Sequence, residues 1–375
     1  MQSEAYRQAS NSVRSRIYRY IYDSKGFCSR QAVAAACGIS MPTLYQNLSE
    51  LMEEGLVRSS GEEQSTGGRK AQGLEIAADA RLAVGIALSE DQIRFALADL
   101  NLRELAFRRI PFDLAARLTE RNVSLAGFLE RFLEETGTDR SRLLGVGIAV
   151  PGMLTEDRSR IYHAPTLHMK DVKMELLTED IPYPVYVEND GSASGFAESF
   201  ARGGDRNLAY ISLENGVGGA VISDGRLYQG DHTHSGEFGH ICVEPGGLRC
   251  NCGRSGCLEA YCSADRIRRE LGISLEEFFA GAERHDPECE TLLYDMLRHL
   301  AVAINNVHMV LDCDVVLGGF LTEYLQPWLP AIRKYVLAGN PFEKTADFVQ
   351  LSILRHHITP LGAALFFVRE FVNGV

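Results

Sequence analysis

Apolar side chains in the first eighty residues recur every three or four positions, which is the spacing of one buried face of a helix. The pattern predicts three short helices with buried positions at Val13, Ile17 and Ile21, at Val33, Ala34 and Cys37, and at Leu44, Leu48 and Leu51. Ser29 and Ser40 are placed to cap the second and third helices. Gly38 lies between these two helices, where a tight turn requires a positive φ. Three helices joined in this way are typical of a helix-turn-helix unit.

Two short apolar strands, at residues 56–58 and 74–76, follow these helices and enclose a polar loop at 61–73. Arg69 and Lys70 lie in that loop, so it could contact phosphates or enter a minor groove. The exposed face of the third helix carries uncharged side chains that could read base edges: Met41, Thr43, Tyr45, Gln46 and Asn47. We therefore interpret residues 1–80 as a winged helix-turn-helix DNA-binding domain. The alternative is a small helical interaction module with a solvated loop.

The rest of the chain alternates between strands and helices. Strands are predicted at 82–88, 92–99, 104–110, 144–150, 208–213, 218–222 and 315–317. Helices are predicted near 123–136, within 264–310 and at 362–372. We expect two α/β lobes that enclose a cleft, the first comprising 81–192 plus 360–375 and the second comprising 193–359. The last apolar helix is expected to cross back to the first lobe.

Charge is distributed unevenly along the chain. The formal net charge is −12, yet residues 1–80 contain nine Lys/Arg and nine Asp/Glu and are neutral. Because an acidic surface repels nucleic acid, a DNA site is expected in this neutral segment. No apolar run approaches the roughly 20 residues of a membrane span. The first residues lack the apolar core of a signal peptide. The chain is therefore predicted to be a cytoplasmic protein with no membrane partner.

A group of cysteines provides the sharpest chemical signal. Cys250, Cys252 and Cys257 lie within eight residues, and His240 precedes Cys250 by ten residues. Three thiolates and one imidazole form a closed tetrahedral set, which is typical of structural zinc. We therefore predict one structural Zn²⁺ per chain. The alternative is a set of loop cysteines kept reduced in the cytoplasm; the odd total of nine cysteines does not favour a secreted disulfide framework.

Two segments around this cluster resemble the signature of the ROK family (repressors, open reading frames and sugar kinases). They are Gly236-Glu237-Phe238-Gly239-His240 and the run from Cys250 to Glu259. Glu188-Asn189-Asp190 resembles the family's sugar-binding segment, and Val316-Leu317-Gly318-Gly319 resembles its adenosine-side strand and turn. The front of the chain resembles the family's repressor branch, that of the xylose and N-acetylglucosamine repressors. The resemblance implies an actin-like (hexokinase-like, ribonuclease H-like) fold, a sugar in the cleft, and a homodimer or homotetramer.

The resemblance also implies roles for individual residues. The side chains that would bind sugar hydroxyls are Asn189, Asp190, Glu237, His240 and Glu259, and His240 would also bind the metal. In a kinase, Asp190 would be the general base. A buried polar pocket favours a polyol because it rejects ligands that lack matching hydroxyls. The expected partners are operator DNA and a sugar or sugar-phosphate effector.

The two segments that would hold nucleotide phosphates depart from the pattern of the family's kinases. Ala87 replaces the acid of an Asp-x-Gly-Gly-Thr motif, Glu90-Asp91 replaces its Gly-Thr, and Glu214 replaces the first glycine of Gly-Thr-Gly-x-Gly-Gly. Carboxylates repel a triphosphate. We therefore expect a sugar-responsive transcriptional repressor with a degenerate, non-catalytic kinase cleft. Two alternatives are an ATP-dependent sugar kinase with an accessory DNA-binding domain, and a regulator that responds to a transporter subunit.

Overall fold

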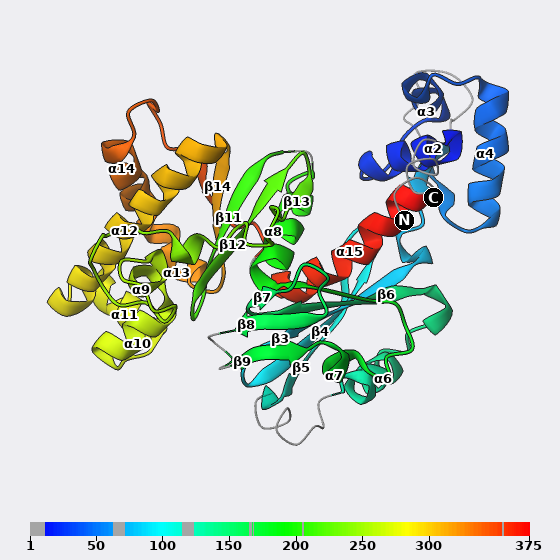
Figure 1. Ribbon diagram of the computed structural model, residues 1–375. Coiled ribbons are helices and arrows are strands. Elements are labelled where there is room, and N and C mark those ends of the chain that lie inside the picture. Colours follow the sequence, from blue (N-terminus) through cyan, green and yellow to red (C-terminus); the bar gives the residue numbers. More distant parts are fainter. Residues whose placement is uncertain are drawn as a thin grey trace.

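In the computed structural model, a small head and two α/β lobes follow one another along the chain (Figure 1). The head, in blue, lies at one end, and helix α8 (Asp190–Ala201) lies where the two lobes meet. Helix α15 (Ile358–Gly374), in red, runs from between the lobes to the head. The structure describes residues 12–62, 72–114, 124–164, 167, 169–204, 206–354 and 356–375.

The head has the elements expected of a winged helix-turn-helix. They are α2 (Val13–Asp23), α3 (Arg30–Cys37), α4 (Met41–Glu53), β1 (Val57–Glu62) and β2 (Gln72–Ile76). Ser29 and Ser40 cap α3 and α4, because their hydroxyl oxygens accept hydrogen bonds from the N–H groups of Ala32 and Thr43. Gly38 has a φ of 61°, as the turn requires. The three apolar faces meet in one core, which confirms the predicted helices.

The first lobe is built on a five-stranded sheet in the order β10-β6-β3-β4-β5. Its strands are β3 (Leu82–Leu88), β4 (Gln92–Asp99), β5 (Glu104–Pro111), β6 (Leu143–Val150) and β10 (Val185–Asn189). Strands β3 to β5 are antiparallel, whereas β6 and β10 add in parallel. Helix α6 (Ala126–Glu135) packs on this sheet, with the rings of Phe132 and Phe95 stacked at 5.4 Å between centroids.

Helix α15 packs on β3 and β6 of the same sheet, which confirms the predicted return of the last helix to the first lobe. The approach is so close that a Cβ on Gly85 would lie 1.6 Å from the carbonyl oxygen of Pro360. A small sheet of β7 (Met153–Leu154), β8 (Arg160–Ala164) and β9 (Met169–Lys173), followed by α7 (Glu175–Thr178), was not predicted. Its strands are two to five residues long and partly exposed, so they carry no clear alternation of apolar residues.

The second lobe has a five-stranded sheet in the order β13-β12-β11-β14-β15. Its strands are β11 (Leu208–Leu213), β12 (Val217–Ser223), β13 (Arg226–Tyr228), β14 (Asp314–Gly318) and β15 (Val349–Leu351). Its helices are α9 (Leu258–Cys262), α10 (Ala264–Leu271), α11 (Leu275–Glu283), α12 (Pro287–Leu311), α13 (Thr322–Leu325) and α14 (Leu329–Gly339). The helical region expected within 264–310 thus consists of α10, α11 and α12. Together they bury a large apolar core against the sheet.

Helix α8 is packed between α15 and strands β11 and β12, so it contacts both lobes. A Cβ on Gly362 of α15 would lie 1.9 Å from the carbonyl oxygen of Ala193, so α15 cannot move closer to α8. The carboxylate of Glu198, also on α8, is fully buried. It accepts hydrogen bonds from Arg202 Nε, Ser352 Oγ and the N–H groups of Ile353 and Leu354 at 2.6–3.2 Å. These bonds tie α8 to the segment that leads into α15.

Replacing this carboxylate, in Glu198→Ala, should strongly destabilise the chain. The Nε of Arg202 and the backbone N–H groups of Ile353 and Leu354 would lose their acceptor. We expect the free energy of unfolding to fall by about 3–5 kcal/mol in urea denaturation. The control is Glu135→Ala, because the Arg108–Glu135 ion pair is exposed and its loss should cost about 1 kcal/mol or less. Equal losses in the two variants would contradict this role of Glu198.

Candidate functional site

A polar cavity of about 190 Å³ lies between the two lobes. The first lobe contributes Ser89, Glu90 and Arg94, and the second contributes residues 214–218, which form the turn after β11 and the start of β12. All five side chains expected to contact a sugar line this cavity: Asn189, Asp190, Glu237, His240 and Glu259. The fold therefore brings together residues that are up to seventy positions apart in the sequence.

Asn189 and Asp190 stand at the start of α8, where the helix meets the cavity. Asn189 is the N-cap: its side-chain oxygen accepts from the N–H of Ser192, and its amide nitrogen donates to the carbonyl of Gly152, both at 3.0 Å. Asp190 accepts from the N–H of Gly191 at 2.8 Å. Burial in the cleft, together with the charge of Glu214, raises the pKa of Asp190 to about 7.

The other three side chains come from the second lobe. Burial raises the pKa of Glu237, while the imidazoles of His240 and His234 act in the opposite direction. Glu259, at the start of α9, accepts from the N–H of Val217 at 3.1 Å, so it is anchored to the first residue of β12. Its other oxygen lies 3.7 Å from the thiol sulfur of Cys250. Glu259 therefore connects the cavity with the cysteine cluster.

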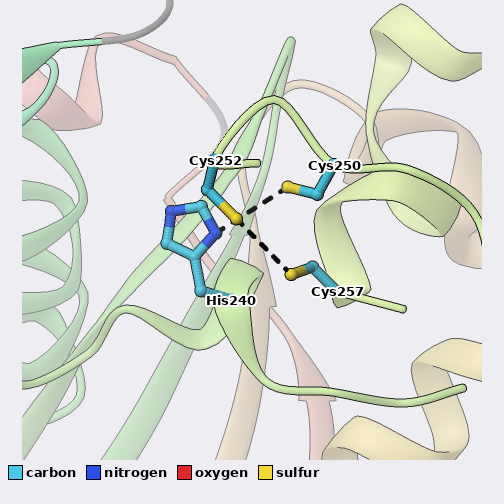
Figure 2. A group of neighbouring side chains, drawn as sticks. All are labelled: His240, Cys250, Cys252 and Cys257. Atoms are coloured by element: carbon cyan, nitrogen blue, oxygen red, sulfur yellow. Dashed lines mark hydrogen bonds between the residues drawn. The ribbon is translucent and has the colours of Figure 1, made fainter. Parts of the chain in front are cut away.

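The four residues predicted to bind a metal gather in one cluster (Figure 2), and two of them, His240 and Cys250, line the cavity. Nitrogen or sulfur ligand atoms of His240, Cys250, Cys252 and Cys257 all lie within 4.8 Å of one another. Such a set can hold a metal ion in tetrahedral coordination. His240 ends the 3-10 helix η4 (Phe238–His240), which places its imidazole opposite the cysteine loop.

The cysteine loop is folded by local geometry. Gly253 and Gly256 adopt φ values of 90° and 86°, a region that favours glycine and lets the chain turn back between the cysteines. Two neighbouring cysteines stay outside the metal set. Cys262 is buried and its thiol points to the carbonyl of Met296 at 3.4 Å, whereas Cys242 is exposed.

The altered phosphate segments also face the cavity. Glu90 and Glu214 both line it, and burial raises the pKa of Glu214. Sequence reasoning missed Arg94, which pairs across the β3–β4 ladder with Ala87 and reaches the same cavity. The available signal in the sequence was that Arg94 is the one basic residue in the largely apolar strand at 92–99. The acids that share the cavity with Arg94 become visible only when the lobes are assembled.

Glu188, in the segment that resembles a sugar-binding motif, has a different environment from its two neighbours. It is 6% exposed and accepts hydrogen bonds at 2.9–3.0 Å from Arg158 Nη2, Tyr186 Oη, Gln229 Nε2 and the N–H of Asn189. Gln229 follows β13 of the second sheet, so this buried carboxylate joins the two lobes.

The side chains expected to contact DNA lie on α4 and beyond β1. Tyr45 and Gln46 are exposed, with Tyr45 at 55%. Thr43 shares a hydrogen bond with the Ser40 hydroxyl at 2.8 Å, and Met41 packs partly against the head's core. Asn47 donates to the carbonyl of Thr43. Arg69 and Lys70 lie outside the described residues.

Comparison with known proteins places this arrangement in a family. Residues 83–370 match the model of the ROK family. The chain belongs to the ROK family. Residues 9–60 match a helix-turn-helix domain. The xylose repressor of Bacillus spizizenii is 26% identical to this ROK protein over 360 residues, which cover 92% of each chain. The DNA-binding transcriptional dual regulator NagC of Escherichia coli is 25% identical over 386 residues, which cover 96% of this chain and 93% of NagC.

A solved ROK family transcriptional regulator, a homologue of the E. coli MLC protein, shares the fold over its whole length. The two structures align with a TM-score of 0.77 and 24% identity, covering 98% of each chain. The family resemblance and the fold inferred from sequence are thereby confirmed for this ROK protein. In the described part of the chain, no helix is both long and apolar enough to cross a bilayer.

Asp190 should make the stability of this ROK protein depend on pH. Its pKa is about 7 in the folded chain and about 3.9 in an unfolded one. Between these values the folded chain binds more protons, so stability falls as the pH rises, and Glu214 and Glu237 act in the same direction. In Asp190→Asn, the melting temperature should fall less between about pH 5 and about pH 8 than in the wild type. The exposed Asp231→Asn is the control; an unchanged pH dependence in Asp190→Asn would contradict the raised pKa.

Proposed function

We propose that this chain is a sugar-responsive DNA-binding transcriptional regulator that acts as a repressor. The observation that carries the proposal is the path of helix α8, which begins in the cleft at Asn189 and Asp190 and ends at the head. Its twelve residues span about 18 Å at the usual helical rise. The two ends of one helix thus reach the cavity and the DNA-binding unit. Similarity to a xylose repressor and to NagC supports the same function.

The head rests on the ends of both central helices. The ring of Phe200, in the last turn of α8, lies 6.3 Å from that of Tyr22 on α2, and the Lys25 ammonium lies 5.6 Å from the Phe200 centroid. Near the end of α15, the ring of Phe371 lies 6.4 Å from that of Tyr18 in an edge-on contact. A displacement of α8 or α15 therefore changes the surface on which the head is seated.

The cleft residues give a sugar a means of moving these helices. Asn189 caps α8 and Asp190 is its first residue, whereas Glu237, His240 and Glu259 belong to the second lobe. We propose that all five bind hydroxyls of one sugar or sugar phosphate, so that the ligand favours one arrangement of the lobes. This is a population shift, and it requires the ligand to bind one arrangement better than the other.

The proposed domains follow from this arrangement. They are the DNA-binding head at 1–80, the first lobe at 81–192 plus 360–375, and the second lobe at 193–359. Helix α8 continues across the boundary between the lobes, from 190 to 201, and is shared by them. A helix that belongs to both lobes transmits a change in their relative position.

On DNA, we propose that α4 enters the major groove with Tyr45 and Gln46, supported by Met41 and Thr43. The loop between β1 and β2, with Arg69 and Lys70, would contact phosphates or a minor groove. Each head reads half of an operator, so a homodimer or homotetramer is the proposed assembly. The cytoplasm is the proposed location.

We propose that the metal is zinc, bound once per chain by His240, Cys250, Cys252 and Cys257. Thiolates and imidazole suit zinc, and four protein ligands leave no open position, so the ion is structural. His240 would be held by the metal through one nitrogen while its ring lines the cavity. The ion would thus fix the wall that carries Glu237 and His240.

We further propose that the cleft has no kinase activity. Glu90 and Glu214 line the cavity where a triphosphate would need cationic or backbone N–H partners. Repulsion between two charges 4 Å apart is about 1 kcal/mol in water and larger at lower dielectric. The second candidate, an ATP-dependent sugar kinase with an accessory DNA-binding domain, is favoured by Asp190, whose pKa of about 7 suits a general base.

Gel shifts with DNA from upstream of the protein's own gene test the regulator. The wild type should bind this DNA, and one sugar in a panel should change its affinity. In Phe200→Ala the sugar should still bind, but its effect on DNA affinity should fall by about tenfold, which is about 1.4 kcal/mol of coupling. The control is Phe196→Ala, which removes a ring from the same helix that contacts Phe366 instead of the head.

Three results would contradict this proposal in different ways. A full sugar response in Phe200→Ala would exclude the route through α8. ATP-dependent phosphorylation of a sugar, lost in Asp190→Ala, would favour the kinase. Absence of a response to every sugar, together with a tight protein partner in a pulldown, would favour the regulator controlled by a transporter subunit.

Elemental analysis tests the metal. The wild type should carry about one zinc per chain, and Cys252→Ser should lose most of it, because three ligands bind zinc far less tightly than four. The control is Cys242→Ser, which removes an exposed thiol that lies outside the cluster. Cys242 is close to the cluster along the backbone, because its main chain pairs with that of Cys257 as in an antiparallel sheet. Zinc-free wild type, or equal zinc in wild type and Cys252→Ser, would contradict the site.

A further inference from the structure

Two opposite charges face the cavity from different lobes. Arg94 belongs to β4 of the first lobe, and Glu214 directly follows β11 of the second. Among the described residues, neither side chain has a hydrogen bond or an ion pair. The Nε atom of Arg94 is enclosed and has no acceptor. Charged groups that line a cavity without partners lower the stability of the folded chain, unless a ligand or a movement of the lobes provides those partners.

Arg94 has no acid at its own position in the sheet. Its neighbours on the two adjacent strands are Ala87 of β3 and Arg109 of β5, and the adjacent residues of its own strand, Ile93 and Phe95, are fully buried on the opposite face. Strand alternation therefore directs the guanidinium to the cavity side of the sheet. The charge of Arg94 lowers the pKa values of both Glu214 and Asp190, against the larger effect of burial.

Glu214 is held by its backbone instead. Its N–H donates to the carbonyl of Gly216 at 2.9 Å, and its own carbonyl accepts from the N–H of Ala264 at 2.8 Å. Gly319 lies against it, since a Cβ there would be 2.8 Å from Glu214 Cγ. The carboxylate is thus attached to a fixed part of the second lobe, and it moves toward Arg94 only when the lobes themselves approach.

We propose that Arg94 and Glu214 form an ion pair across the cleft when the lobes close, and that this pair selects an uncharged sugar as the ligand. The inference rests on the proposed function, which it deepens by naming the class of effector. A neutral polyol can occupy the hydroxyl-binding residues while the two charges meet. A phosphate or carboxylate group beside Arg94 would separate the pair and lie close to Glu214 and Asp190, which repel it.

Removal of water from the cleft explains why the ion pair between Arg94 and Glu214 contributes mainly when the lobes are closed. In an open cleft, water weakens the attraction between the two charges, and salt screens it further. In a closed cleft the attraction is stronger, but removing one partner then leaves a buried charge unpaired. The affinity for an uncharged sugar should therefore decrease as ionic strength rises, although the ligand itself carries no charge.

Titration calorimetry on the full chain tests the pair. The probes are D-xylose, D-glucose and N-acetylglucosamine, with glucose 6-phosphate and N-acetylglucosamine 6-phosphate as charged counterparts. Arg94→Glu and Glu214→Arg should each weaken binding of the preferred uncharged sugar by about tenfold or more, or about 1.4 kcal/mol. The double variant R94E/E214R restores opposite charges and should recover affinity to within about threefold of wild type.

Arg131→Glu is the matched control. Arg131 lies on α6 in the same lobe as Arg94, but it is exposed and is not among the residues that line the cavity. Arg131→Glu makes the same change of charge away from the cavity, so sugar affinity should change by less than about threefold. Melting temperatures of all variants, measured without sugar, show whether each one is folded.

The outcomes separate the inference from the proposed function. A folded wild type that binds none of the five probes would contradict the proposed sugar response. A chain that binds a sugar, but in which R94E/E214R is as weak as the single variants, would contradict the ion pair. Tighter binding of a sugar phosphate than of its uncharged counterpart would overturn the selection of an uncharged ligand.

Discussion

The confinement of helix α8 between two lobes is the constraint on which the rest of the structure depends. One side of the helix is pressed against α15 and another against the second sheet, with backbone contacts that leave no space for a side chain at Gly362. The buried carboxylate of Glu198 fixes its far end to the segment that enters α15. A helix so enclosed moves as a rigid body, and it carries cavity residues at one end and head contacts at the other.

Buried carboxyl groups determine which ligands the cleft favours. Asp190, Glu214 and Glu237 each have a raised pKa because the cavity removes them from water. Acceptors in such a place favour hydroxyl donors over anions. Glu188 shows the contrasting case, since four protein donors surround its carboxylate and it joins the lobes. Two acids only two positions apart, Glu188 on β10 and Asp190 at the start of α8, therefore have different roles, one in structure and one at the cavity.

The sequence predicted much of this architecture, and the successes share a physical basis. The helices of the head, the long strands and the last helix follow from local periodicity, which reports which face of an element is buried. The metal cluster follows from ligands and glycines in one short loop, with His240 added by the preceding turn. The short strands β7 to β9 were missed because they are small and partly exposed, so their pattern of apolar residues is weak.

The sequence by itself determined the elements of the head and the His/Cys cluster that could bind a metal, because each rests on spacing within a local segment. The five side chains expected to contact a sugar came from the resemblance to the ROK family. Only the tertiary structure decided that Arg94 and Glu214 face one cavity and that Glu188 turns away from it. It alone decided that Phe200 meets Tyr22. These contacts join residues far apart in the chain, and no local spacing encodes them, since they arise from how the lobes and the head pack.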